Sequence, residues 1–531
     1  MMKTPKYYTP ETDLRKGEAL SCDLCIYGAT SAGVVAAIEA RRQGLTVVLL
    51  APGDHIGGMT TGGLGFTDFG DKAIIGGISR EFYRRLGDHY GVEEEWRFEP
   101  SVASKVFDGM MREAGVSPIP KQYLADVEME EESLKAVLLE SGLRVEAGMF
   151  MDATYEGDLM AKAGVRYTVG REPNDCYGEF CNGVQVREHH QFLLPVSPYR
   201  VPNDRRSGLL PGINEAPLEP QGSGDHKIQA YNFRLCMTQG DGRVPFPKPD
   251  DYDPERYELL GRYLDSGWRD LYEKFDAIRG GKTDTNNHGP FSSDFIGGNH
   301  AYPEASFVER EEIFQSHVSY HQGLLWFMAN DDRVPEDVRA GISSWGLAED
   351  EFTGTSNWPP QLYVREARRM VSDYVITEMD CRGIARAEDV VAFGAYGMDS
   401  HNCQRIVVGD RVLNEGDVQI WVKPYPVSYR SLIPSRGETK NLLVPVCLSA
   451  SHIAYGSVRM EPVFMMLAQA CVLAAKLCLA QHCAVQDLSY SDLRRELLSV
   501  GQILDLENSS EKKEWLANEF YKINPENALL T

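Results

Sequence analysis

Two short apolar runs near the start of the chain flank a glycine turn and a helical stretch. Leu24 to Tyr27 form the first run, Gly28 and Gly33 follow it, and after Gly44 a second run covers residues 45–50. This order predicts a strand, a turn, a helix and a second, parallel strand. Such a unit binds the pyrophosphate of a dinucleotide at the N-terminus of its helix.

A second glycine cluster follows the second strand at once. A nicotinamide-binding unit does not need this cluster, whereas a flavin enzyme does, because its backbone must run close along the cofactor. In the first turn, Thr30 replaces the middle glycine of G-x-G-x-x-G, and we expect its hydroxyl and that of Ser31 to donate to phosphate. Ala51 stands where an acid that holds the ribose is expected. The cluster consists of Gly57, Gly58, Gly62, Gly63 and Gly65.

Further along the chain the pattern changes twice. Residues 76–115 are predicted to be helical, and 122–151 to form strands with a hairpin that leads into a loop and helix at 152–164. From about 171 to 385, Pro, Asn, Tyr, Trp and turn signals become frequent. The helices expected in this stretch cover 254–278, 307–329 and 360–381. Residues 386–440 are predicted to be rich in strands, and 441–483 to form a buried strand, a loop and a long apolar helix.

The loop before that last helix is a third candidate binding element. In SVRMEPVF (457–464), Pro462 suits the first turn of a helix, where its missing N–H costs nothing. We expect the backbone N–H groups of Ser457 to Met460 to point at a ligand, and the helix dipole to favour the negative charge of a reduced flavin. The alternative is a plain junction between a loop and a helix.

Composition excludes several classes of protein. The chain has 531 residues, of which 43% are hydrophobic and 25% charged, and its net charge of −24 disfavours nucleic acids and anionic membranes. No apolar stretch reaches about 18 residues, so no membrane span is expected. The 11 cysteines are an odd number, and several lie in apolar runs. With no secretory signal visible at the N-terminus, these features predict a cytoplasmic protein.

Taken in order, these blocks resemble the FAD-dependent oxidoreductase family whose members are often labelled "xanthan lyase-like", within the glutathione-reductase-like superfamily. The likeness covers most of the chain and includes YGATSAGVVAAIEA, HIGGMTTGGLG, DATYEGDLMAKAGVRYTVGRE, WPPQLYVREARRM, YGMDSHNCQR and SASHIAYGSVRMEPVFM. It implies an α/β fold: a Rossmann-like, glutathione-reductase-type FAD-binding domain with an inserted α+β substrate lobe. The expected parts are an N-terminal arm (1–20), a discontinuous FAD-binding domain (21–170 and 386–500), the lobe (171–385) and a C-terminal tail (501–531).

The same resemblance implies the cofactor contacts. The expected FAD-binding residues are Gly28, Thr30, Ser31, Ala32, Gly33, Gly57, Gly58, Met59, Thr60, Gly62, Asp152, Ala153, Thr154, Gly157, Asp158, Ser457, Val458, Arg459 and Met460.

A flavin that takes hydride from an alcohol needs a base for the hydroxyl proton, and His is the usual choice near neutral pH. His452 is the first candidate and His401 the second, and either could instead be a structural histidine. Arg430 is the third candidate catalytic residue; it and Arg459 could orient a substrate, or form buried ion pairs. The helix predicted over 360–381 places Arg365 and Arg369 on one face.

Short amide and carboxylate side chains beside aromatic residues suit hydrogen bonding to a polyol, although the same residues also suit ordinary turns. His317 and His321 lie four apart, but no third ligand is evident and no metal is expected. The candidate substrate-binding residues are Lys282, Asp284, Asn287, His321 and Arg365.

The predicted function is an FAD-dependent oxidoreductase that oxidises a small polar substrate, a sugar or sugar acid, and passes electrons to an unknown acceptor. One alternative is a redox-neutral, flavin-assisted lyase or epimerase that acts on a carbohydrate. Another is a non-catalytic FAD-binding protein. No nucleic-acid or membrane partner is expected, and an oligomer is possible.

Overall fold

The principal sheet of the computed structural model, which describes residues 5–271 and 273–506, has six strands. β5 lies at its centre, and β1 is parallel to β5 on one side and to the edge strand β2 on the other. β4 and β3 continue the sheet in antiparallel fashion, and β19 joins the end of β5. The strands are β1 (Ala19–Tyr27), β2 (Val47–Leu50), β3 (Leu124–Glu130), β4 (Ser133–Leu139), β5 (Arg144–Asp152) and β19 (Leu442–Leu443).

Segments from early and late in the chain meet at this sheet. Ile26 of β1 pairs with Leu49 and Met151, and Leu443 pairs with the same Met151. The sequence pattern therefore correctly predicted the parallel pair near the start and the buried strand near residue 442. The carboxyl ends of these parallel strands lie together, which is where ligands bind in open α/β sheets.

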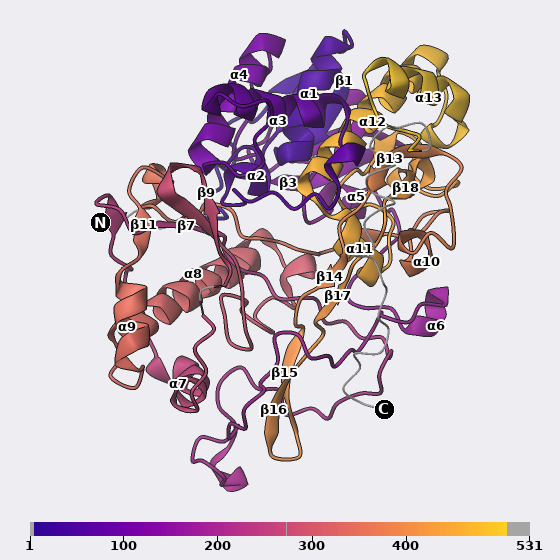
Figure 1. The fold of residues 1–531 in the computed structure, drawn as a ribbon. Coiled ribbons are helices and arrows are strands. Elements are labelled where there is room, and N and C mark those ends of the chain that lie inside the picture. Colours follow the sequence, from indigo (N-terminus) through magenta and orange to yellow (C-terminus); the bar gives the residue numbers. More distant parts are fainter. Residues whose placement is uncertain (1–4, 272, 507–531) are drawn as a thin grey trace.

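Helices α1 (Ser31–Arg42) and α12 (Glu461–Gln481) lie side by side against the sheet (Figure 1). Gln469 of α12 donates a hydrogen bond of 3.0 Å to the buried carboxylate of Glu39 in α1. α3 (Gly77–Tyr90) and α4 (Pro100–Ala114) pack next to them, in the region predicted to be helical.

α12 corrects the expectation that the chain has no stretch long and apolar enough to cross a membrane. By length and composition α12 passes that test, but 78% of its apolar window is buried inside the fold. A helix that is apolar all round and buried by its own protein is typical of a core helix.

A second, antiparallel sheet comes from the chain between β5 and β19 and lies to the left of the principal sheet in Figure 1. α8 (Phe307–Asn330) confirms the helix predicted over 307–329, and a capping box at Ser306 and Glu309 starts it. The sheet has the order β8 (Arg243–Val244), β11 (Gly346–Ala348), β7 (Leu235–Thr238), β10 (Lys282–Thr285), β9 (Phe275–Ile278), and α7 (Glu258–Asp265) and α9 (Glu336–Ser343) lie beside it.

Three predicted elements differ from the structure. The helix expected over 254–278 ends at Asp265, and the last part of that range is strand β9. The helix expected over 360–381 is extended backbone as far as β12 (Arg369–Met370), with one short helix, α10 (Glu378–Cys381), after it. The loop expected at 450–462 contains helix α11 (His452–Val458).

The region predicted to be rich in strands forms antiparallel pairs. The β15–β16 hairpin extends to the opposite end of the molecule from the principal sheet (Figure 1), and Asn214 N donates to Arg405 O there at 2.7 Å. The pairs are β13 (Val390–Gly394) with β18 (Tyr425–Ser428), β14 (Met398–Ser400) with β17 (Val418–Ile420), and β15 (Gln404–Val408) with β16 (Arg411–Glu415). Outside this region, β12 pairs with β6 (Tyr167–Thr168).

The remaining helices are short or lie near the ends of the chain. The expected arm (1–20) includes the start of β1 at Ala19, and most of the expected tail (501–531) lies outside the described residues. These helices are α2 (Gly58–Thr61), α5 (Asp158–Lys162), α6 (Asn174–Tyr177) and α13 (Tyr490–Ser499).

Candidate functional site

The turn between β1 and α1 packs directly against the end of β5. Gly28 has a φ of +104°, and a Cβ atom there would lie 2.6 Å from the backbone of Ala153 and Thr154. At Gly33 a Cβ atom would lie 1.8 Å from Gly28 O. Only glycine permits this approach, because both clashes are with backbone. The turn therefore leaves the N-terminus of α1 open toward a ligand.

The hydroxyl groups of Thr30 and Ser31 were expected to donate to phosphate, and the structure corrects this expectation. Thr30 Oγ1 donates to Ala153 O at 2.7 Å, and Ser31 Oγ donates to the carboxylate of Glu461. Each hydroxyl carries a single proton, so neither is free to donate to a phosphate. The groups that remain for an anion are the backbone N–H groups in the first turn of α1, together with the helix dipole.

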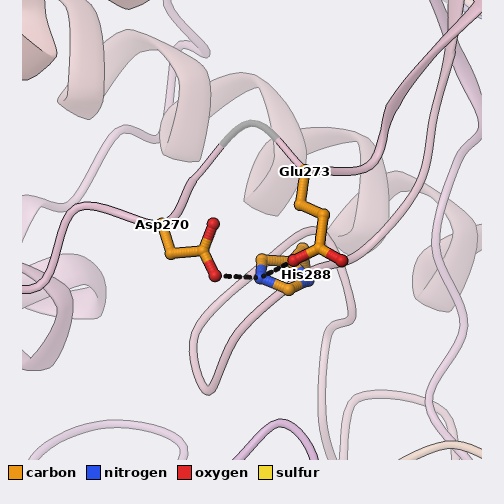
Figure 2. A group of neighbouring side chains, drawn as sticks. All are labelled: Asp270, Glu273 and His288. Atoms are coloured by element: carbon orange, nitrogen blue, oxygen red, sulfur yellow. Dashed lines mark hydrogen bonds and ion pairs between the residues drawn. The ribbon is translucent and has the colours of Figure 1, made fainter.

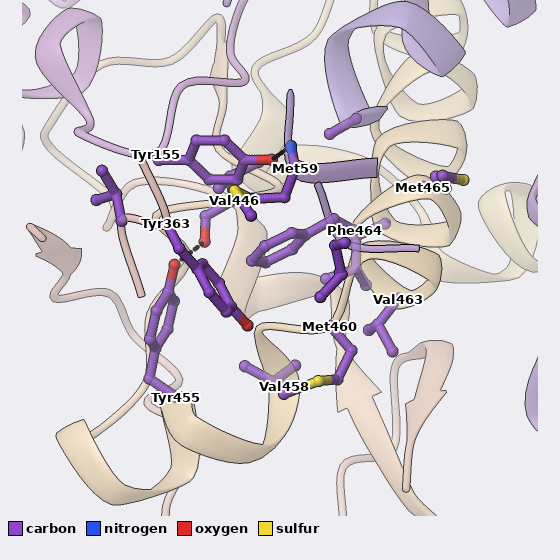
Figure 3. Packing of buried hydrophobic residues seen from close by; sticks show 14 of the residues in the cluster. Met59, Tyr155, Tyr363, Val446, Tyr455, Val458, Met460, Val463, Phe464 and Met465 are labelled. Carbon is purple, nitrogen blue, oxygen red and sulfur yellow. Dashed lines mark hydrogen bonds between the residues drawn. The ribbon is translucent and has the colours of Figure 1, made fainter. Parts of the chain in front are cut away.

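The glycine loop after β2 is fixed to this turn. Gly57 N donates to Ala29 O at 2.7 Å, and Met59 N donates to Tyr155 OH at 2.9 Å. Figure 3 shows Tyr155 turned toward Met59 within a buried cluster. At Gly58, whose φ is +57°, a Cβ atom would lie 2.3 Å from Tyr155 OH. The loop is thus held where a side chain cannot intervene.

Glu461, the first residue of α12, joins these segments. Its carboxylate accepts hydrogen bonds from Ser31, from Thr60 Oγ1 at 2.9 Å and from Tyr155 OH at 2.7 Å. Burial raises the pKa of Glu461 above its ordinary value, and the three hydroxyl donors oppose that shift. One buried carboxylate therefore holds α1, the glycine loop, the end of β5 and α12 together.

A cavity of about 570 Å³ opens where these segments meet. Such a volume suits a cofactor, and glycine walls beside a helix N-terminus are what a pyrophosphate requires. Asp54, three residues beyond Ala51, also lines the cavity and offers a carboxylate for a ribose. The lining residues are 5–7, 9, 28–30, 52–55, 58, 154–156, 314, 354–355 and 360–362.

The fold and this cavity define a dinucleotide-binding α/β protein. Residues 23–497 match the family described as FAD dependent oxidoreductase, and the chain belongs to this family. The protein is accordingly an FAD-dependent oxidoreductase, and FAD is its cofactor. None of the curated proteins compared matches the chain.

Solved structures match only part of the chain. L-proline dehydrogenase from P. horikoshii is 15% identical over 31% of this chain and 59% of its own, with a TM-score of 0.24. THI4 from Thermovibrio ammonificans is 20% identical over 29% and 66%, with a TM-score of 0.22. The bacillithiol disulfide reductase Bdr from Staphylococcus aureus is 16% identical over 30% and 45%, with a TM-score of 0.21. The matched part thus spans less than two thirds of each of these chains.

Asp152 and Asp158, the two acids expected to bind the cofactor, have hydrogen-bond and ion-pair partners within the protein. Asp152 accepts from Thr154 N at 3.0 Å and Met160 N at 2.8 Å, and burial raises its pKa to about 6. Asp158 pairs with Arg310 at 2.6 Å and with Arg368 at 2.7 Å. Both carboxylates shape the junction between β5 and α5, and residues 154–156 of this loop line the cavity.

A second expectation, that the backbone N–H groups of Ser457 to Met460 point at a ligand, is corrected by the structure. Ser457 and Val458 end helix α11, Arg459 N donates to Tyr455 O at 3.0 Å, and Met460 N donates to Val458 O at 2.9 Å. Carbonyl groups of α11, a helix that the sequence did not predict, thus accept hydrogen bonds from the N–H groups of Arg459 and Met460. The N-terminus of α12, which begins at Glu461, is the element that remains here to face a ligand.

The three residues predicted to be catalytic lie in different environments. His452 is 2% exposed; its Nδ1 lies 2.7 Å from a Glu366 oxygen and its Nε2 lies 3.0 Å from Ser400 Oγ. Both ring nitrogens are therefore engaged by protein groups. Arg430 is half exposed and pairs with Asp389 at 3.1 Å. Neither residue lines the cavity beside the glycine turn.

His401 lies in a buried chain of charged groups. Its Nδ1 is 2.7 Å from Asp294 Oδ2, and its Nε2 is 3.4 Å from Asp399 Oδ2. The charge of His401, followed by that of Arg459, lowers the pKa of Asp399 against the effect of burial. His401 thus connects two aspartates, one of which is partly accessible.

The predicted substrate-binding residues do not lie together. Lys282 Nζ is surrounded by three carboxylates at 2.8 Å each, and Asp284 forms a bidentate pair with Arg234 at 2.6 and 2.7 Å. His321 lies beside a cavity of about 50 Å³, where burial lowers its pKa to about 4. Asn287 is buried. Lys282 and Asp284 thus have complete sets of protein partners.

Arg365 belongs to a cluster that the sequence did not reveal. Three guanidinium groups surround the ring of Tyr363, at 4.7 Å for Arg365, 5.7 Å for Arg459 and 5.8 Å for Arg234. Arg459 Nη1 also donates to Tyr363 OH at 2.9 Å. The helix predicted over 360–381 concealed this arrangement, because the segment is extended. The aspartate partners of these arginines are Asp284 for Arg234, Asp294 for Arg365 and Asp399 for Arg459.

Asp68 faces the same cluster and was also missed. It follows the glycine loop and stays partly accessible. Burial raises its pKa, while the charges of Arg234 and Arg459 lower it and that of Asp399 raises it further. No hydrogen bond or ion pair joins it to another described residue, so the carboxylate is free to take a proton. The only signal in the sequence was its place two residues after GGLGF (62–66).

A separate group of side chains lies on the surface near β9. His288 Nε2 lies 2.8 Å from Asp270 Oδ2 and 3.2 Å from Glu273 Oε2 (Figure 2). Both carboxylates are mostly exposed, and a hydrogen-bonded ion pair accounts for the arrangement.

Proposed function

We propose that the protein oxidises a small polar substrate, a sugar or a sugar acid, and that the reaction takes place beside Tyr363. The observation that supports this proposal is the cluster of Arg459, Tyr363 and Asp68. Arg459 immediately precedes Met460 and Glu461 in the chain, and Glu461 binds the turn that starts α1. The polar cluster is thereby connected to the FAD-binding segments.

FAD bound in this fold supplies the hydride acceptor. In the proposed reaction, Asp68 takes the proton of the substrate hydroxyl, because it has a raised pKa and no partner among the described residues. Arg459 and Arg365 orient hydroxyl or carboxylate groups of the substrate. His401 holds Asp399 ionised and in place next to Arg459.

We further propose that the second sheet and α8 form the substrate lobe, since Arg234 precedes β7 and reaches Tyr363. A cytoplasmic location is part of the proposal. It is supported by the 11 cysteines, all of which are free.

The test is an anaerobic screen of the FAD-loaded protein with sugars, sugar acids and amino alcohols. We expect the flavin absorbance to bleach with one of the first two classes. If product forms without an electron acceptor while the flavin stays oxidised, the redox-neutral lyase or epimerase replaces this proposal. If no compound in the screen reacts in either way, the proposed sugar oxidation is wrong.

A further inference from the structure

The N-terminal arm forms part of the wall of the FAD cavity. Pro5, Lys6, Tyr7 and Thr9 all line it. The family match begins only at residue 23, so residues 5–9 lie outside the matched region.

The arm is attached to α8 at one end. The backbone N–H groups of Tyr7 and Tyr8 donate to Glu311 Oε2 at 2.7 and 3.0 Å, and Lys6 Nζ lies 3.3 Å from Glu311 Oε1. Gln315 Nε2 donates to Pro5 O at 2.9 Å. Hydrogen bonds to an ionised acceptor are stronger than neutral ones, so Glu311 is the principal attachment.

At its other end the arm is attached to the principal sheet. Thr9 N donates to Tyr123 OH at 2.9 Å, and Tyr123 OH donates to Tyr7 O at 3.0 Å. Tyr8 OH donates to Glu140 at 2.7 Å, and its ring meets that of Tyr123 edge to face at 4.7 Å. The arm therefore crosses the cavity from the sheet to α8.

We propose that residues 5–9 are a strap that retains FAD, and that Glu311 holds this strap closed. Among the described residues that line the cavity, Lys6 is the one Lys or Arg, and it supplies positive charge for the pyrophosphate of FAD. Release of FAD requires the arm to detach, so the strap slows dissociation. By reciprocity, bound FAD stabilises the attached arm.

The first test measures the rate at which FAD leaves the full-length, FAD-loaded protein after dilution. Glu311→Ala removes the carboxylate that accepts from the backbone N–H groups of Tyr7 and Tyr8, and it leaves every lining residue itself unchanged. We expect release to become about tenfold faster. Glu312→Ala changes the next, exposed residue of α8 and serves as the matched control, with release at the rate of the unchanged protein. Equal rates for Glu311→Ala and the unchanged protein would overturn the proposal.

A second measurement uses the arm itself. Trypsin cleaves after Lys6, and we expect added FAD to slow this cleavage in the unchanged protein and to protect less in Glu311→Ala. Tyr123→Phe, which removes the acceptor for Thr9 N, loosens the other attachment and should act in the same direction. Thermal unfolding of each variant without FAD shows whether the fold is kept. Cleavage that is indifferent to FAD in the unchanged protein contradicts the strap.

The proposal depends on FAD binding and not on the substrate. A protein that holds FAD tightly but is bleached by no sugar would refute the proposed reaction and leave the strap intact. A protein that holds FAD and releases it equally fast with and without Glu311 would refute the strap alone.

Discussion

Glu461 at the start of α12 accepts a hydrogen bond from Ser31 at the start of α1, although 430 residues separate them. The first turns of two helices are thereby joined through one buried carboxylate. Because Thr60 and Tyr155 donate to the same group, Glu461 fixes the relative positions of every segment around the glycine turn.

Replacing Glu461 by Ala should leave three buried hydroxyl groups without an acceptor. We expect the free energy of unfolding to fall by about 2–4 kcal/mol, and FAD affinity to fall with it. Glu461→Gln keeps an acceptor for Tyr155 and should cost less. Denaturant titration measures both variants, and an alanine variant as stable as the unchanged protein would contradict this role.

Gly28→Ala should be far more damaging than Gly44→Ala. Both glycines have a positive φ, but a Cβ atom at Gly28 meets the backbone of Ala153 at 2.6 Å, whereas nothing lies within 4 Å at Gly44. Gly44→Ala therefore carries only the backbone strain, about 1 kcal/mol, and Gly28→Ala should lose about 3 kcal/mol or more. Thermal unfolding measures the loss of stability in each variant. Equal losses would show that the close approach of the Ala153 backbone is not the reason for a glycine at position 28.

Asp54 should take the place of the ribose-binding acid that is absent at Ala51. It lines the cavity, and its carboxylate is mostly exposed to it or to solvent. Asp54→Ala should raise the Kd for FAD about tenfold, the effect of losing a hydrogen bond to a charged acceptor. Asp88→Ala, at an exposed position of α3, is the control. An unchanged Kd in a fluorescence titration of Asp54→Ala would assign the ribose to another group.

Asp68→Asn should slow flavin reduction by about 100-fold or more, the usual contribution of a general base. Because burial raises the pKa of Asp68, the rate in the unchanged protein should increase as pH rises through that pKa, and the variant should lose this dependence. FAD affinity should stay within about twofold. Asp71→Asn keeps the cap on the next turn and is the matched control. Stopped-flow reduction with full activity in Asp68→Asn would remove Asp68 from the reaction.

Glu156 should make the protein less stable as the pH rises. Burial raises its pKa from 4.5 to about 7, and Tyr302 OH donates to it at 2.9 Å. The unfolded chain loses this proton near pH 4.5 and the folded protein only near pH 7, so the stability that the proton confers is complete below pH 4.5 and lost by pH 7.

Glu156→Gln should therefore stabilise the protein by about 1–3 kcal/mol at pH 8 and not at pH 4. Glu312→Gln, at an exposed position, should have no effect at either pH. Thermal unfolding across this range checks the sign, and a variant that is less stable at pH 8 than the unchanged protein would contradict it.

The amino-acid sequence by itself determined the β1–α1–β2 unit, the glycine turns, α8 and the buried helix α12. These features depend on the spacing of apolar and glycine residues within a few turns of chain, which is a local property. The start of α1 at Ser31, with Thr30 as its cap, follows from the same local pattern.

Only the tertiary structure decided which polar groups meet. Thr30 and Ser31 were expected to donate to phosphate, but Ala153 and Glu461 accept their protons because folding brings distant segments beside them. The segment around Arg365 has a helical pattern and is nevertheless extended. Its arginines reach carboxylates on separate segments, and the pairing of buried charges outweighs local helix propensity.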